Sequence, residues 1–147
     1  MPRLVGPGAG LLVAGLAPAL TAVRLSLHVL GASVWVGGQI TMVGLLPAAR
    51  RAGPDAPRSL GRAFSRLQWP AYILLVGTGV WNVTATAGNQ AAAWNVVLGV
   101  KIAVVAAAGL GAWLHGRARS KAGLAVWGAV AAAASIAALV LGVLLAG

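Results

Sequence analysis

The stretch from residue 21 to residue 47, TAVRLSLHVLGASVWVGGQITMVGLLP, constrains the fold of this chain more than any other. It is long and almost wholly apolar, as expected of a helix that spans a membrane. Within it Arg24, His28, Trp35 and Gln39 recur at steps of four, seven and four residues, which places them close to one stripe of an α-helix. Lipid offers an imidazole or a guanidinium no hydrogen-bond partner, so this stripe is expected to face protein or water.

The composition also indicates that the bilayer is the solvent. Of the 147 residues, 60% are hydrophobic and 8% are charged. One membrane crossing takes about 20 residues and a connection, so the length suits four crossings in one domain. We predict an all-α fold, a polytopic membrane four-helix bundle formed by residues 1–147, with spans at about 19–46, 64–84, 91–114 and 122–145.

Proline, glycine and tryptophan set the expected ends of these spans. Residues 1–20 resemble a signal peptide, and their Gly and Pro content predicts an irregular or partly helical lead-in at the external interface. Pro47 is expected to end the first span. A solvated loop should follow at 48–63, with room for a short interfacial helix from near Pro57. Trp69 and Trp81, near the two ends of the second span, are expected in the interfacial aromatic belts.

The net charge of +10 is concentrated in two short segments, 48–66 and 115–121. Two basic connections in an apolar chain are typical of the positive-inside rule, which places both on the cytoplasmic side and both termini outside. We therefore expect a multi-pass protein of a bacterial-type inner (cytoplasmic) membrane, with anionic lipids rather than nucleic acid as the partner of these cations. The predicted headgroup contacts are Arg50, Arg51, Arg58, Arg62, Arg66, Arg117, Arg119 and Lys121.

Two absences in the sequence exclude several kinds of site. The chain has no cysteine, which excludes disulfides, cysteine-bound zinc, iron–sulfur clusters and thiol catalysis. Asp55 is the only acidic residue, so one chain cannot form a pair of catalytic carboxylates. No Ser–His pairing can be read from the spacing either. We expect no catalytic residues, and binding or transport is a better expectation than hydrolysis or group transfer.

Five polar side chains from three spans are predicted to lie in the outer half of the bundle, whereas Gln39 lies in the cytoplasmic half: the five are Arg24, His28, Asn82, Asn95 and Lys101. Counted from the outer surface at 1.5 Å per residue, His28 lies about 10 Å deep and Lys101 about 14 Å deep. Arg24 is one turn above His28. The candidates for binding a ligand or metal are therefore His28, Lys101 and Arg24, supported by Asn82, Asn95, Trp35 and Gln39.

Each of the three candidates also has a structural alternative. A lysine in mid-span costs about 3 kcal/mol on insertion scales, and no carboxylate is available to pair with it. Lys101 could instead reach the outer headgroups with its long side chain. His28 could be a neutral imidazole bonded to a neighbouring helix, and Arg24 could be an interfacial anchor.

Three motifs in order resemble the CopD (copper resistance D) domain family. The first is a histidine followed by Trp-x-Gly-Gly, here His28 with Trp35, Gly37 and Gly38. The second is the Arg-Phe-Ser-Arg motif with a following Thr-Gly, here R62-A-F-S-R66 with G77-T-G79, and the third is the mid-helix lysine of L98-G-V-K101. The resemblance covers about residues 24–115. It implies a four-helix inner-membrane domain that handles or transports copper.

A first-span histidine seven residues before a tryptophan, with a lysine in a later span, also resembles HemJ-type membrane proteins. That resemblance implies binding of haem or another porphyrin, with an axial imidazole and with Arg24 and Lys101 beside the propionates. A third interpretation makes the chain an accessory subunit of a larger membrane complex or a homo-oligomer. One chain supplies few copper ligands: two histidines on opposite sides of the membrane, and Met1 and Met42.

Overall fold

A computed structural model describes the backbone of residues 7–86, 88 and 90–146, and the side chains of residues 18–86, 88 and 90–145. In that part of the chain the structure is helical and contains no strand. A first long rod comprises α1 (Pro7–Ala32), a π-helical turn η1 (Ser33–Gly37) and α2 (Gly38–Ala52). Three further helices follow: α3 (Ala56–Thr86), α4 (Ala92–Arg117) and α5 (Lys121–Ala146).

Three helices of the described chain are long and apolar enough to cross a membrane, and together they indicate a multi-pass membrane protein. These segments are Pro18–Ala52, Ala92–Arg117 and Lys121–Leu145. The helix α3 is longer than α4 and α5 but less apolar, because its first part carries Arg58, Arg62 and Arg66 and its later part Gln68 and Asn82. Much of the apolar surface lies outside the protein core, as a lipid-facing protein requires: Val29, Val43, Ile73, Val96 and Leu144 are all exposed.

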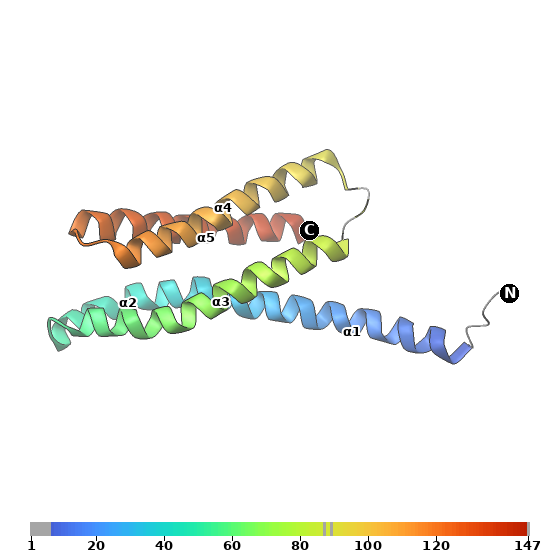
Figure 1. Cartoon of the computed structure of the whole chain (residues 1–147), viewed down its shortest axis with the longest axis horizontal. Helices are drawn as coiled ribbons and strands as arrows, with labels where there is room; N and C mark the ends of the chain where they lie inside the picture. Colours follow the sequence, from blue (N-terminus) through green and yellow to red (C-terminus); the bar gives the residue numbers. More distant parts are fainter. Residues whose placement is uncertain (1–6, 87, 89, 147) are drawn as a thin grey trace.

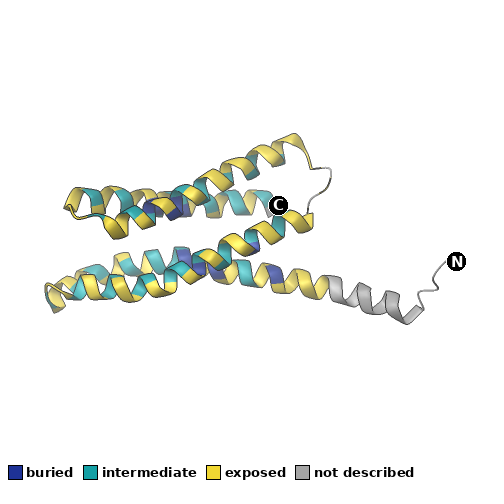
Figure 2. Ribbon diagram, in the orientation of Figure 1, coloured by how far each residue is buried: buried dark blue, intermediate teal, exposed yellow. Residues whose placement is uncertain are grey.

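The helices pack as two antiparallel hairpins (Figure 1). One hairpin is the first rod against α3, and the other is α4 against α5. The short connections at 53–55 and 118–120 lie at the same end of the molecule, and the connection from α3 to α4 lies at the other end (Figure 1). Buried residues gather near the middle of the hairpins, while most of the remaining surface is exposed or half-buried (Figure 2).

The helices extend beyond the predicted spans, into segments that the sequence predicts to be loops. The expected loop at 48–63 is mostly helix, since only residues 53–55 separate α2 from α3. Pro47 lies inside α2 and does not end it, because an exposed proline inside a membrane helix removes only one backbone hydrogen bond. Pro57 lies in the first turn of α3, where a missing N–H costs nothing, so no separate short helix forms.

The N-terminal lead-in and the second basic connection are also more helical than the sequence predicts. The backbone is helical from Pro7, through Pro18, where an irregular segment was expected, and residues 1–6 lie outside the described residues. The loop expected at 115–121 shortens to residues 118–120. The connection is closed by the Ala118 N–H, which donates to the His115 carbonyl at 3.2 Å, and by the Leu124 N–H, which donates to the Ser120 carbonyl at 3.0 Å.

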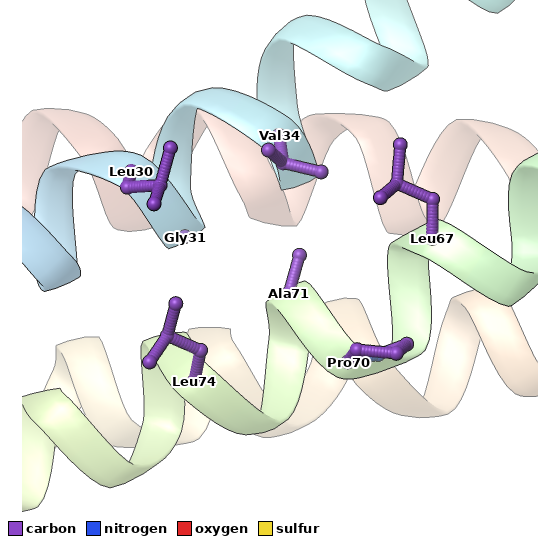
Figure 3. Close-up of a pocket in the computed structure, with 7 residues that line it drawn as sticks. All are labelled: Leu30, Gly31, Val34, Leu67, Pro70, Ala71 and Leu74. Carbon is purple, nitrogen blue, oxygen red and sulfur yellow. The ribbon is translucent and has the colours of Figure 1, made fainter.

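Glycines allow the closest approaches between helices. A Cβ at Gly31 of α1 would lie 3.2 Å from the Ala71 carbonyl oxygen of α3, and one at Gly111 of α4 would lie 3.0 Å from the Ala131 nitrogen of α5. Beside the first contact is a small groove of about 230 Å³. Figure 3 shows that apolar side chains from α1, η1 and α3 line it. They are Leu30, Val34, Leu67, Pro70, Ala71 and Leu74, with Gly31.

We expect Gly109→Ala and Gly99→Ala to separate packing from helix propensity on α4. A Cβ at Gly109 would collide with the Tyr72 ring and disturb the bond from its hydroxyl to Val105. Nothing lies within 4 Å of a Cβ at Gly99. Gly109→Ala should therefore lower the free energy of unfolding by about 1–3 kcal/mol. Gly99→Ala should leave it unchanged or raise it by up to about 1 kcal/mol.

The measurement is reversible unfolding in sodium dodecyl sulfate, followed by tryptophan fluorescence. Equal effects of the two substitutions would contradict the contact between α3 and α4.

Candidate functional site

The first site residue, His28, is held by α3. Its Nδ1 lies 2.9 Å from the Thr78 hydroxyl oxygen. That hydroxyl donates its only proton to the Leu74 carbonyl at 2.6 Å, so it accepts from His28 and Nδ1 carries the ring proton. The ring also interacts with the Leu75 backbone. With the proton on Nδ1, the lone pair is on Nε2, which makes no hydrogen bond with any side chain that the structure describes. This arrangement is the one found where a histidine binds a metal through the other nitrogen.

Arg24 and Asn82 lie one turn farther toward the α3–α4 end. His28 pairs with Thr78 across two antiparallel helices, so the next turn of α1 faces the next turn of α3, and Arg24 comes level with Asn82. Arg24 is only 9% exposed. Its Nε and the Asn82 side-chain oxygen are both buried without a hydrogen-bond partner in the described structure. Arg24 is therefore packed inside the protein and is not an interfacial anchor.

Lys101 brings a second cation to this part of the molecule. It is half-buried on α4, and its ammonium is close enough to the His28 ring for the two to interact electrostatically. A Cβ at Gly142 of α5 would lie 3.1 Å from Nζ, so the side chain runs along α5. Nζ forms no ion pair and no hydrogen bond with the residues described. The surroundings of His28 thus include two cations, Arg24 one turn away on α1 and Lys101 on α4.

The two remaining predicted residues of the stripe belong to a separate aromatic centre. Trp35 is 1% exposed in the middle of η1 and donates from Nε1 to the Ser135 hydroxyl of α5 at 2.8 Å. The Gln39 amide donates to the same hydroxyl and to the Trp35 carbonyl, each at 3.1 Å. The Ser135 hydroxyl in turn donates a hydrogen bond to the Ala131 carbonyl at 2.6 Å. The two hairpins are therefore linked by hydrogen bonds at mid-height.

Rings from α3 complete this centre. The Trp35 ring packs 4.5 Å from Tyr72 and 6.2 Å from Trp69, measured between ring centres. Tyr72 in turn donates to the Val105 carbonyl of α4 at 2.9 Å. Trp69 is therefore part of the protein interior and not of an interfacial belt, because its ring is held edge-on against Trp35 and Tyr72.

Several predicted residues lie outside both groups. Asn95 is exposed on the first turn of α4, and its side chain makes no hydrogen bond in the described structure, so it does not join the cluster. Arg117 stacks its guanidinium 3.7 Å from the centre of the Trp113 ring. Arg51, Arg66 and Arg119 are exposed. The remaining basic residues line a cleft between the hairpins: Arg50, Arg58, Arg62 and Lys121.

Residues of the separate sequence motifs contact one another. His28 packs beside Thr78 and Gly79, since a Cβ at Gly79 would lie 3.5 Å from its Cε1. Gly38, which follows Trp35, is covered by the Phe64 ring, which leaves no room for a Cβ. Sequence reasoning missed Ser135 and Tyr72 as partners of Trp35. Their only signal was a hydroxyl in an apolar span, which is compatible with many positions.

Comparison of the chain with protein-family models, with curated proteins and with solved structures gives no match in any of the three.

The hydrogen bond to Thr78 predicts the tautomer of His28. With ¹⁵N-histidine labelling only His28 and His115 give signals, and a His115→Gln variant assigns them. We expect the proton of neutral His28 on Nδ1. Thr78→Val should shift it toward Nε2, because the acceptor of the bond is lost. Thr84→Val is the matched control, since the Thr84 hydroxyl bonds only within its own helix. Protonated Nε2 in the unchanged protein would contradict this geometry.

Proposed function

We propose that this chain is a CopD-type inner-membrane protein that handles copper, with His28 Nε2 as its metal ligand. In this proposal all four helices cross the membrane, the two basic connections face the cytoplasm, and both termini face outward. The location of both connections at one end of the molecule supports this orientation (Figure 1). The contacts between residues of the separate motifs support the resemblance on which the proposal depends.

The observation that carries the proposal is the fixed orientation of the His28 ring. A hydrogen bond through Nδ1 holds the imidazole and leaves a directed lone pair at Nε2. His28 is half-buried, which leaves part of the ring accessible to a ligand.

The other donors limit what one chain can do with copper. The described residues contain no group of three His, Cys, Asp or Glu side chains that could hold a metal ion. Met42 lies on α2, well away from His28 along the first rod. One imidazole near the Lys101 ammonium binds a copper ion weakly, which suits transfer of the ion better than storage. Further ligands would come from a second copy of the chain or from a partner in a larger membrane complex.

Haem or another porphyrin is the second candidate, favoured by the charge of the site. Arg24 and Lys101 have no carboxylate beside them, and the only acid of the chain, Asp55, lies between α2 and α3 at the opposite end of the rod. Cations without acids attract an anion more readily than a metal cation. His28 would supply an axial imidazole, and Arg24 and Lys101 would hold the propionates.

Metal analysis and an absorption spectrum of the purified protein test both candidates. For copper handling we expect copper(I) to bind, and His28→Gln to weaken that binding at least tenfold, while His115→Gln leaves it unchanged. His115 is the matched control, because it lies in the last turn of α4, away from His28.

For haem we expect a Soret band after addition of haem that His28→Gln shifts or abolishes. A colourless protein that also binds no copper, alone or with its membrane partners, would contradict both candidates. The chain would then be better explained as an accessory subunit.

A further inference from the structure

A cleft separates the two hairpins at the end that carries the basic connections. It has a volume of about 1490 Å³ and lies between α2 and α3 on one side and α4 and α5 on the other. This volume is far larger than a single buried water needs. Such a space does not stay empty inside a membrane, so the character of its walls decides what fills it.

The cleft changes character with depth. Arg50, Arg58, Arg62 and Lys121 line it near the connections, and Gln39 and Ser135 line it near the middle of the molecule. Apolar side chains form most of the wall between these levels, among them Val43, Leu46, Phe64, Ala125 and Ala132. The cations are thus at the mouth and the apolar surface is inside.

The length of the cleft matches one leaflet of a bilayer. Lys121 and Ser135 are 14 positions apart on α5, or about 21 Å at 1.5 Å per residue. Half of a bilayer with its headgroups is also about 20–22 Å thick. The basic mouth therefore comes level with headgroups when the apolar wall comes level with acyl chains.

The charges at the mouth have a single acid near them, in the connection between α2 and α3, and the four cations outnumber it. Asp55 is the only acid of the chain, and it is not among the residues that line the cleft. Arg58 and Arg62 lie four residues apart on α3, where two like charges destabilise a helix unless an anion lies between them. A phosphate would accept hydrogen bonds from these guanidiniums.

We propose that this cleft binds one anionic phospholipid, with its phosphate between the arginines of α2 and α3 and an acyl chain along the apolar wall. Four of the eight basic residues then serve a specific lipid site, and the others contact the membrane surface. This site is separate from His28 and does not depend on what His28 binds.

Native mass spectrometry of the protein in mild detergent tests the charges. We would add phosphatidylglycerol, which is anionic, or phosphatidylcholine, which carries no net charge. We expect the protein to retain one phosphatidylglycerol tightly and no phosphatidylcholine. Because basic residues attract an anionic lipid, Arg50→Gln with Arg58→Gln and Arg62→Gln should weaken its binding at least about tenfold. Arg51→Gln with Arg66→Gln and Arg119→Gln removes the same charge outside the cleft and should change binding less than twofold.

A second variant tests the apolar wall without changing the charge. Ala132→Phe fills the cleft from α5 and should also weaken retention at least tenfold. Unfolding in sodium dodecyl sulfate checks that each variant is folded. Equal losses in the two arginine triples would overturn the proposal in favour of general surface attraction. Full displacement of the lipid by inorganic phosphate, or no effect of Ala132→Phe, would show that the site recognises phosphate alone and would also overturn it.

Discussion

The hydrogen bond from Trp35 to Ser135 is the interaction on which the rest of the structure depends. Polar groups in an apolar protein gain most from partners within the protein, because lipid offers none. Trp35 meets this requirement by crossing from one hairpin to the other, and its ring packs against Trp69 and Tyr72. The bond from Tyr72 to Val105 joins the same hairpins from α3 to α4. These contacts hold the hairpins together at mid-height.

The π-helical turn makes this contact possible. A wider turn inserts one residue and rotates the following helix by about 100° relative to a regular α-helix. Trp35 can therefore face α5 while His28, two turns earlier, faces Thr78 of α3. Side chains compensate for the altered backbone, since Gln39 and Thr41 donate to the carbonyls of Trp35 and Gly37. The turn thus directs His28 toward α3 and Trp35 toward α5, although both belong to one stripe in the sequence.

This division leaves a different environment on each side of the aromatic centre. Toward the α3–α4 connection are His28, Arg24 and Lys101, with one free imidazole nitrogen and two cations. The cleft lies on the side of the basic connections, and Gln39 and Ser135 line its inner end. Because the chain has a single acid, both regions are cationic and both favour anionic or electron-rich ligands. The proposed copper or haem site and the proposed lipid site follow from that shared charge.

The sequence predicted the all-helical fold, because long apolar runs between basic segments leave few alternatives. It also indicated His28, Arg24 and Lys101 as residues of one region. A regular period of 3.6 could not reveal the π-helical turn, so Trp35 and Gln39 were placed on one stripe with His28. Proline rules from soluble proteins placed the end of the first span at Pro47, whereas the helix continues to Ala52. Ser135 was unassigned, since its role depends on Trp35, 100 residues away.

A double-mutant cycle between Trp35→Phe and Ser135→Ala measures this central contact most directly. Hydrogen bonds between membrane helices contribute about 0.6 kcal/mol on average and up to about 1.7 kcal/mol. We predict a coupling energy in that range from reversible unfolding of the four proteins, with the double variant less destabilised than the sum of the single ones. Additive effects would show that the tryptophan and the serine do not interact, and would contradict the account of how the two hairpins are joined.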